Sequence, residues 1–511
     1  MDGCSHCLLK IRRISTIFSY HWPKALVSLW KLQGFMQEWL GRSSSRKLLF
    51  FYIPTVAVKA NIHYLAHSQS MLLHLIMQTL VDMHEKYGPV FRLHMPLLKR
   101  PFVYSNFVPN AIHNRHLDSL RPTKTLSPGS LMGIPLGDRH SKNFHHLSKI
   151  KSNTNFKQML KDVDIVSKDL VQEMLKGEAA SLKSMLLEWS LDAMFLYLYA
   201  THPDTSEKKQ AIIAAVDMFT CEISHRTSEP MWMWFSSFSR VREWTTGFSY
   251  LLNLADEFYG KSASPLPNFM KAHGLEKWEA IDELTIFLAA SFESTAHTVA
   301  QCLIMLSKDS ERQDEAAKEA KKVLAEVGSG PILKEHTDQC MYIQHCVFQA
   351  LRLHATVPFS ARKMEHDYSI KDLNGMSATF IPAKSYLTYF KTAIGDNESI
   401  FPDAKVFEPE RYEGMKTRTE KHMKFLPFGT GPLQCWGQVL AEMQMIQLLI
   451  RLLGNLDFSH TDIDSKSISI ASVSVAAPGV DKVQLCRENK RSELTINGCG
   501  QYMRIVINLS Q

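Results

Sequence analysis

One segment in the last quarter of the chain restricts the fold more than any other. It reads Phe425-Leu-Pro-Phe-Gly-Thr-Gly-Pro-Leu-Gln-Cys-Trp-Gly-Gln-Val-Leu-Ala441, with Cys435 between two glycine turns and the expected start of a helix. A helix N-terminus lowers the pKa of a cysteine, and the thiolate is the form that binds metals. Gly429 and Gly431 allow tight turns, and Gly437 leaves room for the helix beside a flat ligand. The segment therefore predicts a metal site with Cys435 as the ligand.

The composition is that of a globular protein in a reducing compartment. Of 511 residues, 45% are hydrophobic and 21% are charged, without low-complexity bias. The net charge of +7 suits either a solvated surface or contact with an acidic partner or anionic lipid. The cysteines are odd in number and irregularly spaced, so no disulfide framework is predicted. Cys4-Ser-His-Cys7 lacks a second half-site, which favours a chance pair over a zinc or redox site.

The N-terminal segment differs from the rest of the chain. No apolar run reaches the roughly 18 residues of a membrane span. The first 50 residues are basic and aromatic, which suits a segment on a membrane surface and equally a soluble extension. We therefore predict an N-terminal extension over residues 1–59, one large domain over 60–490 and a C-terminal β tail over 491–511.

Hydrophobic periodicity predicts a mainly α protein with a minor β part. Helices are expected over Leu75–Lys86, Lys157–Ala200, Glu276–Lys308, Asp309–Val327, Asp338–Leu353 and from the cysteine loop to about Leu453. Strands are expected over Val90–Met95, Ala378–Ile381, Tyr386–Tyr389 and within Ser467–Leu509.

The cysteine segment resembles the haem-binding loop of the cytochromes P450. Phe428, Cys435 and Gly437 stand at the spacing of that loop, and Gly429 lies within it. Tyr87-Gly-Pro-Val-Phe91 near the start of the chain also looks like a family segment, and the resemblance covers roughly residues 60–490. It implies the cytochrome P450 fold, a single mainly α domain with haem b between the long helix and the helix after the cysteine. A haem held by thiolate favours O–O cleavage.

A second motif departs from the family at one position. Gln349-Ala-Leu-Arg352 is followed by Phe407-Glu-Pro-Glu-Arg411-Tyr412, whereas the family carries Glu-x-x-Arg and a Pro-Glu-Arg-Phe-like segment. The spacing places both side chains on one helical face. Because Gln349 carries no charge, two buried arginines lack one negative partner unless another acid joins them, and we expect weaker stability and haem retention. The alternative is that Arg352 forms only a surface ion pair.

Further residues concern the edge of the haem. In Pro358-Phe-Ser-Ala-Arg362, the resemblance makes Arg362 the ligand of a haem propionate, because a guanidinium fork fits a carboxylate. A solvated surface arginine is the alternative. Leu433 stands where most members have Arg or His for the other propionate. The absence of that basic residue, together with the sequence Phe428-Gly-Thr-Gly431, resembles the branch of sterol 7α-hydroxylases and prostacyclin synthase. Trp436 stands where proline or a small residue is common.

Ala290-Ser-Phe-Glu-Ser-Thr295 resembles the family segment that crosses the haem face opposite the thiolate. The resemblance implies that the catalytic residues are Glu293, Ser294 and Thr295. Glu293 would pass protons through water while Ser294 holds the oxygen by a hydrogen bond. Ser291 replaces a glycine and would narrow the oxygen groove. The alternative is that both hydroxyls bond only to carbonyl groups of the preceding turn.

The resemblance implies a monooxygenase, an oxidoreductase that inserts one oxygen atom into an apolar, lipid- or sterol-like substrate. Electrons would come from NADPH through NADPH-cytochrome P450 reductase at the cytosolic face of the endoplasmic reticulum membrane. No nucleic-acid partner is expected. One alternative is a haem-thiolate isomerase or lyase acting on a lipid peroxide without a reductase. Another is a degenerate member that binds haem or ligand without turnover, which is motivated by Gln349, Leu433, Ser291 and Ser294. The sequence leaves the substrate and the membrane attachment open.

Overall fold

The long apolar segment expected to be helical forms the central helix, α12, which spans Lys277–Ser307. It is buried along most of its length, as expected of a helix that is apolar on nearly all sides. The Glu279 carboxylate accepts a hydrogen bond from the Glu276 amide at 3.1 Å, which stabilises the first turn. The computed structural model describes residues 79–93, 102–109, 138–148, 154–176, 182–228, 238–261, 264–371, 378–415, 424–431, 434–461, 480–488, 491–498 and 501–507. All of them belong to one compact unit, Ile53–Gln511.

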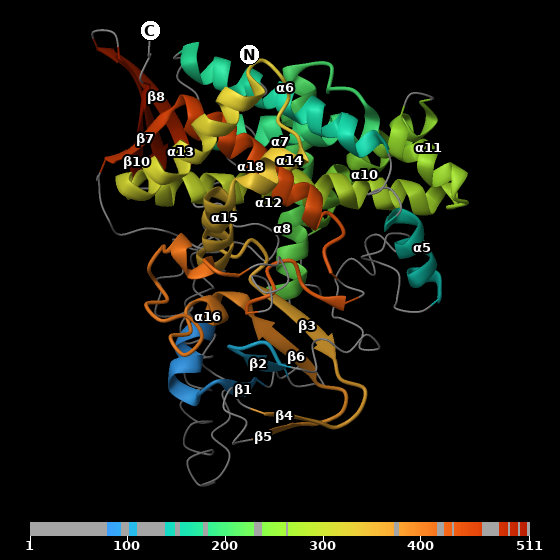
Figure 1. Ribbon diagram of the computed structural model, residues 1–511. Coiled ribbons are helices and arrows are strands. Elements are labelled where there is room, and N and C mark those ends of the chain that lie inside the picture. The colour runs from blue at the N-terminus through green and yellow to red at the C-terminus, as the bar shows by residue number, and fades with distance from the viewer. Residues whose placement is uncertain are drawn as a thin grey trace, which may run out of the picture. The chain divides into compact units, whose positions relative to one another are not determined.

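The other described helices precede and follow α12 along the chain. Those before it are α5 Asp138–Ser148, α6 Thr154–Lys176, α7 Leu182–Tyr199, α8 Ser206–Ser228, α10 Phe238–Gly260 and α11 Pro265–Ala272. Those after it are α13 Ser310–Val327, α14 Lys334–Gln339, α15 Met341–Leu353, α16 Lys391–Gly395, the 3-10 helix η4 Pro409–Tyr412 and α18 Gln438–Asn455. Residues 79–87 are also helical. In the upper part of Figure 1, α6, α7, α12 and α18 pack against one another.

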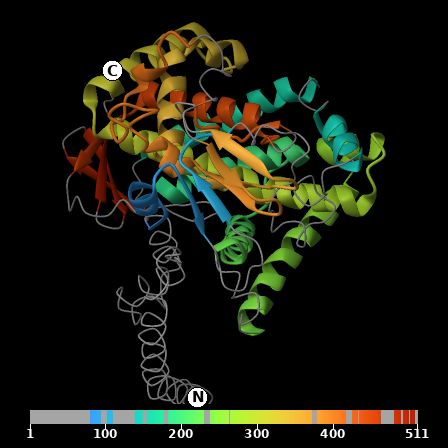
Figure 2. The same cartoon turned by 90° about the horizontal axis from the view of Figure 1, so that it is seen from below.

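The described strands form three small sheets. Their bounds are β1 Val90–Leu93, β2 Phe102–Ser105, β3 Phe359–Lys363, β4 Tyr368–Lys371, β5 Ala378–Ile381, β6 Tyr386–Phe390, β7 Asp457–Thr461, β8 Val480–Glu488, β9 Arg491–Gly498 and β10 Gln501–Ile507. One sheet has the order β1-β2-β6-β3, with β2 and β6 parallel. Another is the antiparallel sheet β7-β10-β9-β8, and the third is the pair β4–β5. Seen from below, the first sheet lies in front of the long helices (Figure 2).

Polar contacts fix α18 in the core. Arg451 forms a bidentate ion pair with Asp164 of α6, with Nε–Oδ1 at 2.9 Å and Nη2–Oδ2 at 2.8 Å. Gln447 donates to the carbonyl oxygens of Leu160 at 2.8 Å and Ile332 at 2.6 Å. A buried charge that keeps a bidentate partner avoids the large cost of an unpaired one. The helix that follows the cysteine loop is therefore held rigidly against α6.

The predicted mainly α fold with a minor β part is confirmed. The helices expected over residues 276–308 and 309–327 are α12 and α13, each within one residue of its expected bounds. The helix expected from residue 338 is wrong at its start, because Cys340, with φ −83° and ψ 72°, separates α14 from α15. The predicted extension over residues 1–59 lies outside the described residues. None of the described helices is both long and apolar enough to cross a membrane.

Candidate active site

The loop before α18 exposes the thiol of Cys435. The other described free cysteines, Cys302, Cys340 and Cys346, are buried. The Cys435 amide donates to the Phe428 carbonyl at 2.8 Å, which closes the loop on itself. An accessible thiol fixed by its own backbone, just before a helix, is suited to bind a metal.

Left-handed backbone gives this loop its shape. The φ angle is 72° at Gly429, 67° at Gly431 and 48° at Leu426. Glycine adopts such angles readily, whereas Leu426 does so at a cost and is held there by its burial in the core. Gly437 has a φ of −79°, which any residue adopts, and a Cβ there would lie 3.9 Å from the Cys435 sulfur. The expected turns are present, and Gly437 keeps a side chain away from the sulfur.

The fold brings the predicted oxygen-handling segment of α12 against this loop. Phe287 stacks on Trp436, the residue after Cys435, with ring centroids 4.7 Å apart and an interplanar angle of 12°. Ala290 and Ser294 lie three and seven positions after Phe287, and therefore on the same face of the helix. Ala290 is exposed on this face although most of α12 is buried. The face that carries Ala290 and Ser294 is thus the one directed to the cysteine loop.

The two predicted catalytic hydroxyls are hydrogen-bonded within their own helix. Ser294 Oγ donates to the Ala290 carbonyl at 2.9 Å, and Thr295 Oγ1 donates to the Ser291 carbonyl at 2.8 Å. Such bonds to the preceding turn are common for serine and threonine in helices. Ser294 is half-buried and Thr295 is buried. Ser294 is therefore the more accessible hydroxyl, and it can donate to a ligand only by rotating away from the Ala290 carbonyl.

Glu293 interacts with α8 and has a strongly raised pKa. Burial raises the pKa of Glu293 to about 7 and the Asp217 carboxylate adds to the rise, while Lys183 and a hydrogen bond with Thr220 oppose it. Its Oε2 atom is buried and has no hydrogen-bond partner within the described part of the chain. A carboxyl group with a pKa near 7 both holds and releases protons at neutral pH. Glu293 is adjacent in sequence to Ser294, but the two side chains have separate hydrogen-bond partners.

Two buried cations contact the cysteine loop. Arg362 of β3 is 4% exposed, and its Nη2 donates to the Thr430 carbonyl at 3.3 Å. Lys391 at the start of α16 is 3% exposed, and its Nζ donates to the Pro427 carbonyl at 3.1 Å. The surface alternative for Arg362 is therefore wrong. Sequence reasoning missed Lys391, although a lysine within the apolar run 386–394 was a usable signal.

Comparison with known proteins identifies the family. Residues 60–481 match the family model described as Cytochrome P450. The chain belongs to the cytochrome P450 family. It is 26% identical to Cytochrome P450 6a2 of Drosophila melanogaster over 234 residues, which cover 46% of each chain. It is 23% identical to the mitochondrial 1,25-dihydroxyvitamin D(3) 24-hydroxylase of Mus musculus over 444 residues, which cover 78% of this chain and 82% of that one.

The family gives this P450 its fold class and cofactor. Members carry haem, need a redox partner and are typically monooxygenases, and the helical structure with small sheets agrees with the P450 fold. The chain spans less than half of the length of the fly relative, and the relatives come from several branches, so no single branch is supported.

The residues present fit a haem. Cys435 offers an exposed thiol, Ala290 leaves an accessible stretch on α12, and Arg362 provides a buried cation for an acidic group. Phe428 is half-buried against the core beside these groups. Leu433, the position without the usual basic residue, lies outside the described residues.

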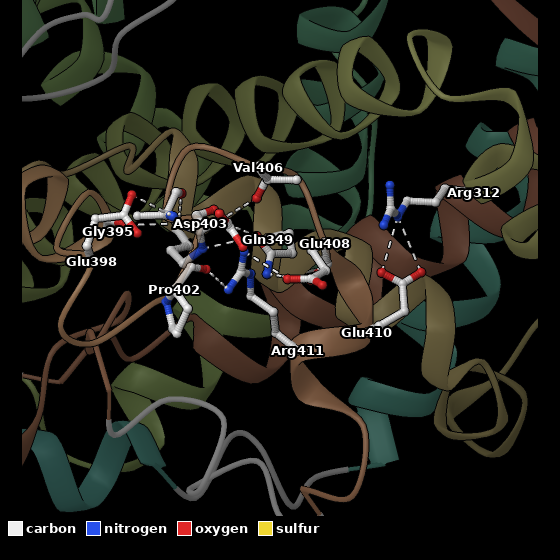
Figure 3. Close-up of polar contacts among 12 residues, drawn as sticks. Arg312, Gln349, Gly395, Glu398, Pro402, Asp403, Val406, Glu408, Glu410 and Arg411 are labelled. Carbon is white, nitrogen blue, oxygen red and sulfur yellow. Dashed lines mark hydrogen bonds and ion pairs between the residues drawn. The ribbon is translucent and has the colours of Figure 1, made fainter.

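Arg352 of this P450 forms no ion pair with a carboxylate of the described residues, and Asp396 and Glu408 act on it only by raising its pKa. It is 1% exposed, and Gln349 Oε1 accepts from its Nε at 3.0 Å and its Nη2 at 2.7 Å. Its other donors reach the carbonyl oxygens of Gly395, Ala404 and Val406. Three residues that accept hydrogen bonds from Arg352, namely Gln349, Gly395 and Val406, are labelled in Figure 3. Burial lowers the pKa of Arg352 to about 10, which leaves the group charged at neutral pH. The surface-ion-pair alternative is wrong.

Arg411 has an acid of its own. Its Nη2 lies 2.8 Å from Glu408 Oε2 and donates to the Asp403 carbonyl at 2.8 Å. Gln349 Nε2 donates to the Glu408 carbonyl at 2.7 Å, which ties this segment to α15. Glu408 is thus the acid that joins the network in place of the missing glutamate, although it pairs with Arg411 and not with Arg352.

The next glutamate, Glu410, binds a third arginine that sequence reasoning missed. Arg312 Nε of α13 lies 3.1 Å from Glu410 Oε2, and Figure 3 shows this ion pair. The Tyr342 hydroxyl donates to Glu410 Oε1 at 2.7 Å. Glu408 and Glu410 therefore bind two different arginines. The contacts of this segment with Arg312 of α13 and with Gln349 and Tyr342 of α15 hold it against both helices.

Proposed function

We propose that this P450 is a haem-thiolate monooxygenase that inserts one oxygen atom from O2 into an apolar, lipid- or sterol-like substrate. The observation that carries the proposal is the exposed Cys435 thiol on a left-handed loop, next to the Phe287–Trp436 contact with α12. A haem bound there by thiolate supplies the oxygen-activating chemistry and favours O–O cleavage. The lipid- or sterol-like substrate class rests only on the resemblance of the loop to the sterol 7α-hydroxylase branch, which the relatives do not single out.

Cys435 and its neighbours hold the ligand sulfur in place. The amide bond to Phe428 fixes the loop, the turn at Gly429 lets the backbone approach a flat ligand, and Gly437 keeps the sulfur uncovered. Arg362 would bind a carboxylate of the haem, because a buried guanidinium favours an ionised partner.

Glu293 is the proposed proton donor. Its pKa of about 7 lets it take up a proton and release it again at neutral pH. Asp217 on α8 is exposed and interacts with Glu293, so protons reach the buried carboxyl from that side. Ser294 lies on the face of α12 toward the cysteine loop, and its hydroxyl would donate a hydrogen bond to the oxygen once it turned from Ala290, with the Thr295 hydroxyl behind it.

Electrons are proposed to come from NADPH through NADPH-cytochrome P450 reductase at the cytosolic face of the endoplasmic reticulum membrane. The net charge of +7 supports contact with an acidic partner or with anionic lipid. One relative is named as mitochondrial, which makes the compartment a direct question for experiment. Fractionation of full-length protein into cytosol, mitochondria and microsomes tests this part: recovery in microsomes supports it, and recovery elsewhere contradicts it.

Oxygen incorporation tests the reaction. The holoprotein is incubated with reductase, NADPH, isotopically labelled O2 and a panel of sterols and fatty acids. The expected product carries one labelled oxygen atom and is absent with the Cys435→Ala variant. A product whose oxygen comes entirely from the substrate contradicts monooxygenation.

A second candidate function is the rearrangement of a lipid peroxide. The observation that favours it is that the Ser294 and Thr295 hydroxyls are both hydrogen-bonded to their own helix, while Glu293 interacts with α8. An isomerase needs no proton delivery from these groups. Turnover of a lipid hydroperoxide without NADPH, unchanged by Glu293→Gln, decides for this function. A protein that binds haem and ligands but turns over neither class is a degenerate member.

A further inference from the structure

Lys391 is a buried cation beside the cysteine loop, where its Nζ donates to the Pro427 carbonyl and lies 5.8 Å from the centre of the Tyr389 ring. We propose that Lys391, together with Arg362, binds the two carboxylate groups of the haem. This inference rests on the haem site proposed above and assigns it a second cationic ligand.

The backbone places both cations at the same loop. β3 and β6 are antiparallel neighbours, with Arg362 opposite Leu387, and Lys391 follows directly after β6. The Lys391 amide donates to the Pro358 carbonyl at 2.6 Å, which fixes the start of its side chain. Lys391 Nζ and Arg362 Nη2 then reach carbonyl oxygens only three residues apart in the cysteine loop, at Pro427 and Thr430.

The charges around Lys391 leave a place for an anion. Burial lowers the pKa of Lys391 to about 8, Cys435 raises it and Arg362 lowers it further. The Cys435 thiolate is the one anion among these influences, and its charge is shared with a metal once the sulfur is bound. No carboxylate is among them, and the Arg362 guanidinium repels the ammonium group. Two like charges are costly to bury side by side unless an anion lies between or next to them. A haem carries two carboxylates on one edge, which matches two cations in charge and in number.

The donor geometry also leaves capacity for such a ligand. An ammonium group has three N–H donors, and Pro427 accepts one of those of Lys391. A charge-assisted hydrogen bond to a carboxylate is stronger than a neutral one. Leu433, two residues before Cys435, offers no charge from the loop itself. Lys391 therefore supplies a positive charge that the loop sequence lacks.

A second role for Lys391 must be separated from this one, because its charge also acts on Cys435. The probe is the haem itself, prepared with both carboxylates free or as the dimethyl ester. Wild-type, Lys391→Met and Lys391→Arg proteins are loaded with each form. Loss of the cofactor to excess apomyoglobin is then followed by absorption. Lys371→Met, at an exposed position on β4, is the matched control.

With free haem, Lys391→Met is expected to lose the cofactor about tenfold to a hundredfold faster than wild type, since one charge-assisted hydrogen bond is missing. With the dimethyl ester this difference is expected to fall to less than about threefold, because the partner carboxylates are blocked. Lys391→Arg and Lys371→Met are expected to stay close to wild type with both forms. An equal loss with haem and ester would show that Lys391 acts on the sulfur or on the fold, and would overturn the inference.

If Lys391→Met does not accumulate as folded protein, Lys391→Arg carries the test by resonance Raman spectroscopy. A changed hydrogen-bond donor shifts the bending mode of the haem propionates, and an unshifted mode contradicts the inference. A wild-type protein that takes up no haem at all would instead contradict the haem site as a whole, so the two failures are distinguishable.

Discussion

The surroundings of Arg352 and the loop of Cys435 both contain motifs that resemble the P450 family in sequence, but the two regions are built in opposite ways. Arg352 is enclosed by acceptors from Gln349 and three backbone carbonyls, so its site is complete with protein atoms alone. The cysteine loop has left-handed backbone at Leu426, an exposed thiol and a buried lysine without a carboxylate partner in the described structure. The first region stabilises the fold. The second has the backbone strain and the buried cations, Arg362 and Lys391, expected of a ligand site.

Replacing Arg352, the arginine at the centre of the first region, should have the largest effect on the free energy of unfolding. Arg352→Met removes the partner of Gln349 and leaves carbonyl oxygens at Gly395 and Val406 buried without a donor. We expect a loss of about 4 kcal/mol or more in the free energy of unfolding, or no folded protein. Urea unfolding followed by circular dichroism measures it. Arg312→Met, at a partly exposed ion pair, is the control and should cost only about 1 kcal/mol. A loss of the same size in both variants would show that the first region is not special.

A substitution that disturbs the tight packing around Arg352 should have the next largest effect on the free energy of unfolding. A Cβ added at Gly395 would lie 2.5 Å from the Arg352 carbonyl oxygen, which belongs to the backbone and cannot rotate away. Gly395→Ala should therefore lower the free energy of unfolding by about 3 kcal/mol. Gly260→Ala is the matched control, because nothing lies within 4 Å of a Cβ at that position. Equal melting temperatures for the two variants would contradict the packing.

Glu293 on the ligand side should make stability depend on pH. Its pKa rises from 4.5 to about 7 in the folded protein, so between these values the folded state holds a proton that the unfolded chain has released. Its stabilising contribution is therefore complete below pH 4.5 and is lost as the pH rises through 7. Across this window, the stability of the wild type should decline by about 3 kcal/mol, and Glu293→Gln should abolish that decline. Unfolding at several pH values checks this against the exposed control Glu335→Gln, and parallel curves for wild type and Glu293→Gln would refute it.

Restoring the charge at Gln349 should have the smallest effect. Gln349→Glu gains a charged acceptor for Arg352 but loses the Nε2 donor that bonds the Glu408 carbonyl. Since both changes occur in a network that is already satisfied, we expect stability and haem content to change by less than about 1 kcal/mol and less than about twofold. Thermal unfolding and haem quantification measure both. A gain of several kcal/mol would mean that the neutral residue leaves a real defect.

The sequence predicts those features that depend on local pattern. The apolar run of α12 and the charged run of α13 give helices with nearly the expected bounds. Gly429 and Gly431 form the expected left-handed turns, because glycine adopts a positive φ without the steric cost that a side chain brings. The assignment of Cys435, Arg362 and Phe428 to haem binding stays a prediction, since it depends on a cofactor that is not part of the polypeptide.

The features that the sequence does not predict depend on distant backbone atoms. The acceptors of Arg352 at Gly395 and Val406 lie more than forty residues away, and a carbonyl group carries no signature in the sequence. Local periodicity also cannot show that Glu293 turns toward α8 while its neighbour Ser294 lies on the other side. Lys391 was overlooked because a single lysine among apolar residues is more often found at a surface.

The most direct test of the haem-thiolate site is the absorption spectrum of the reduced protein under carbon monoxide. Wild-type protein and Cys340→Ala, which lacks a buried cysteine, should both show the red-shifted Soret band of a thiolate-bound haem. Cys435→Ala should lose that band. A Cys435→Ala protein with the same spectrum as wild type would contradict the sulfur–iron bond and every role assigned around it.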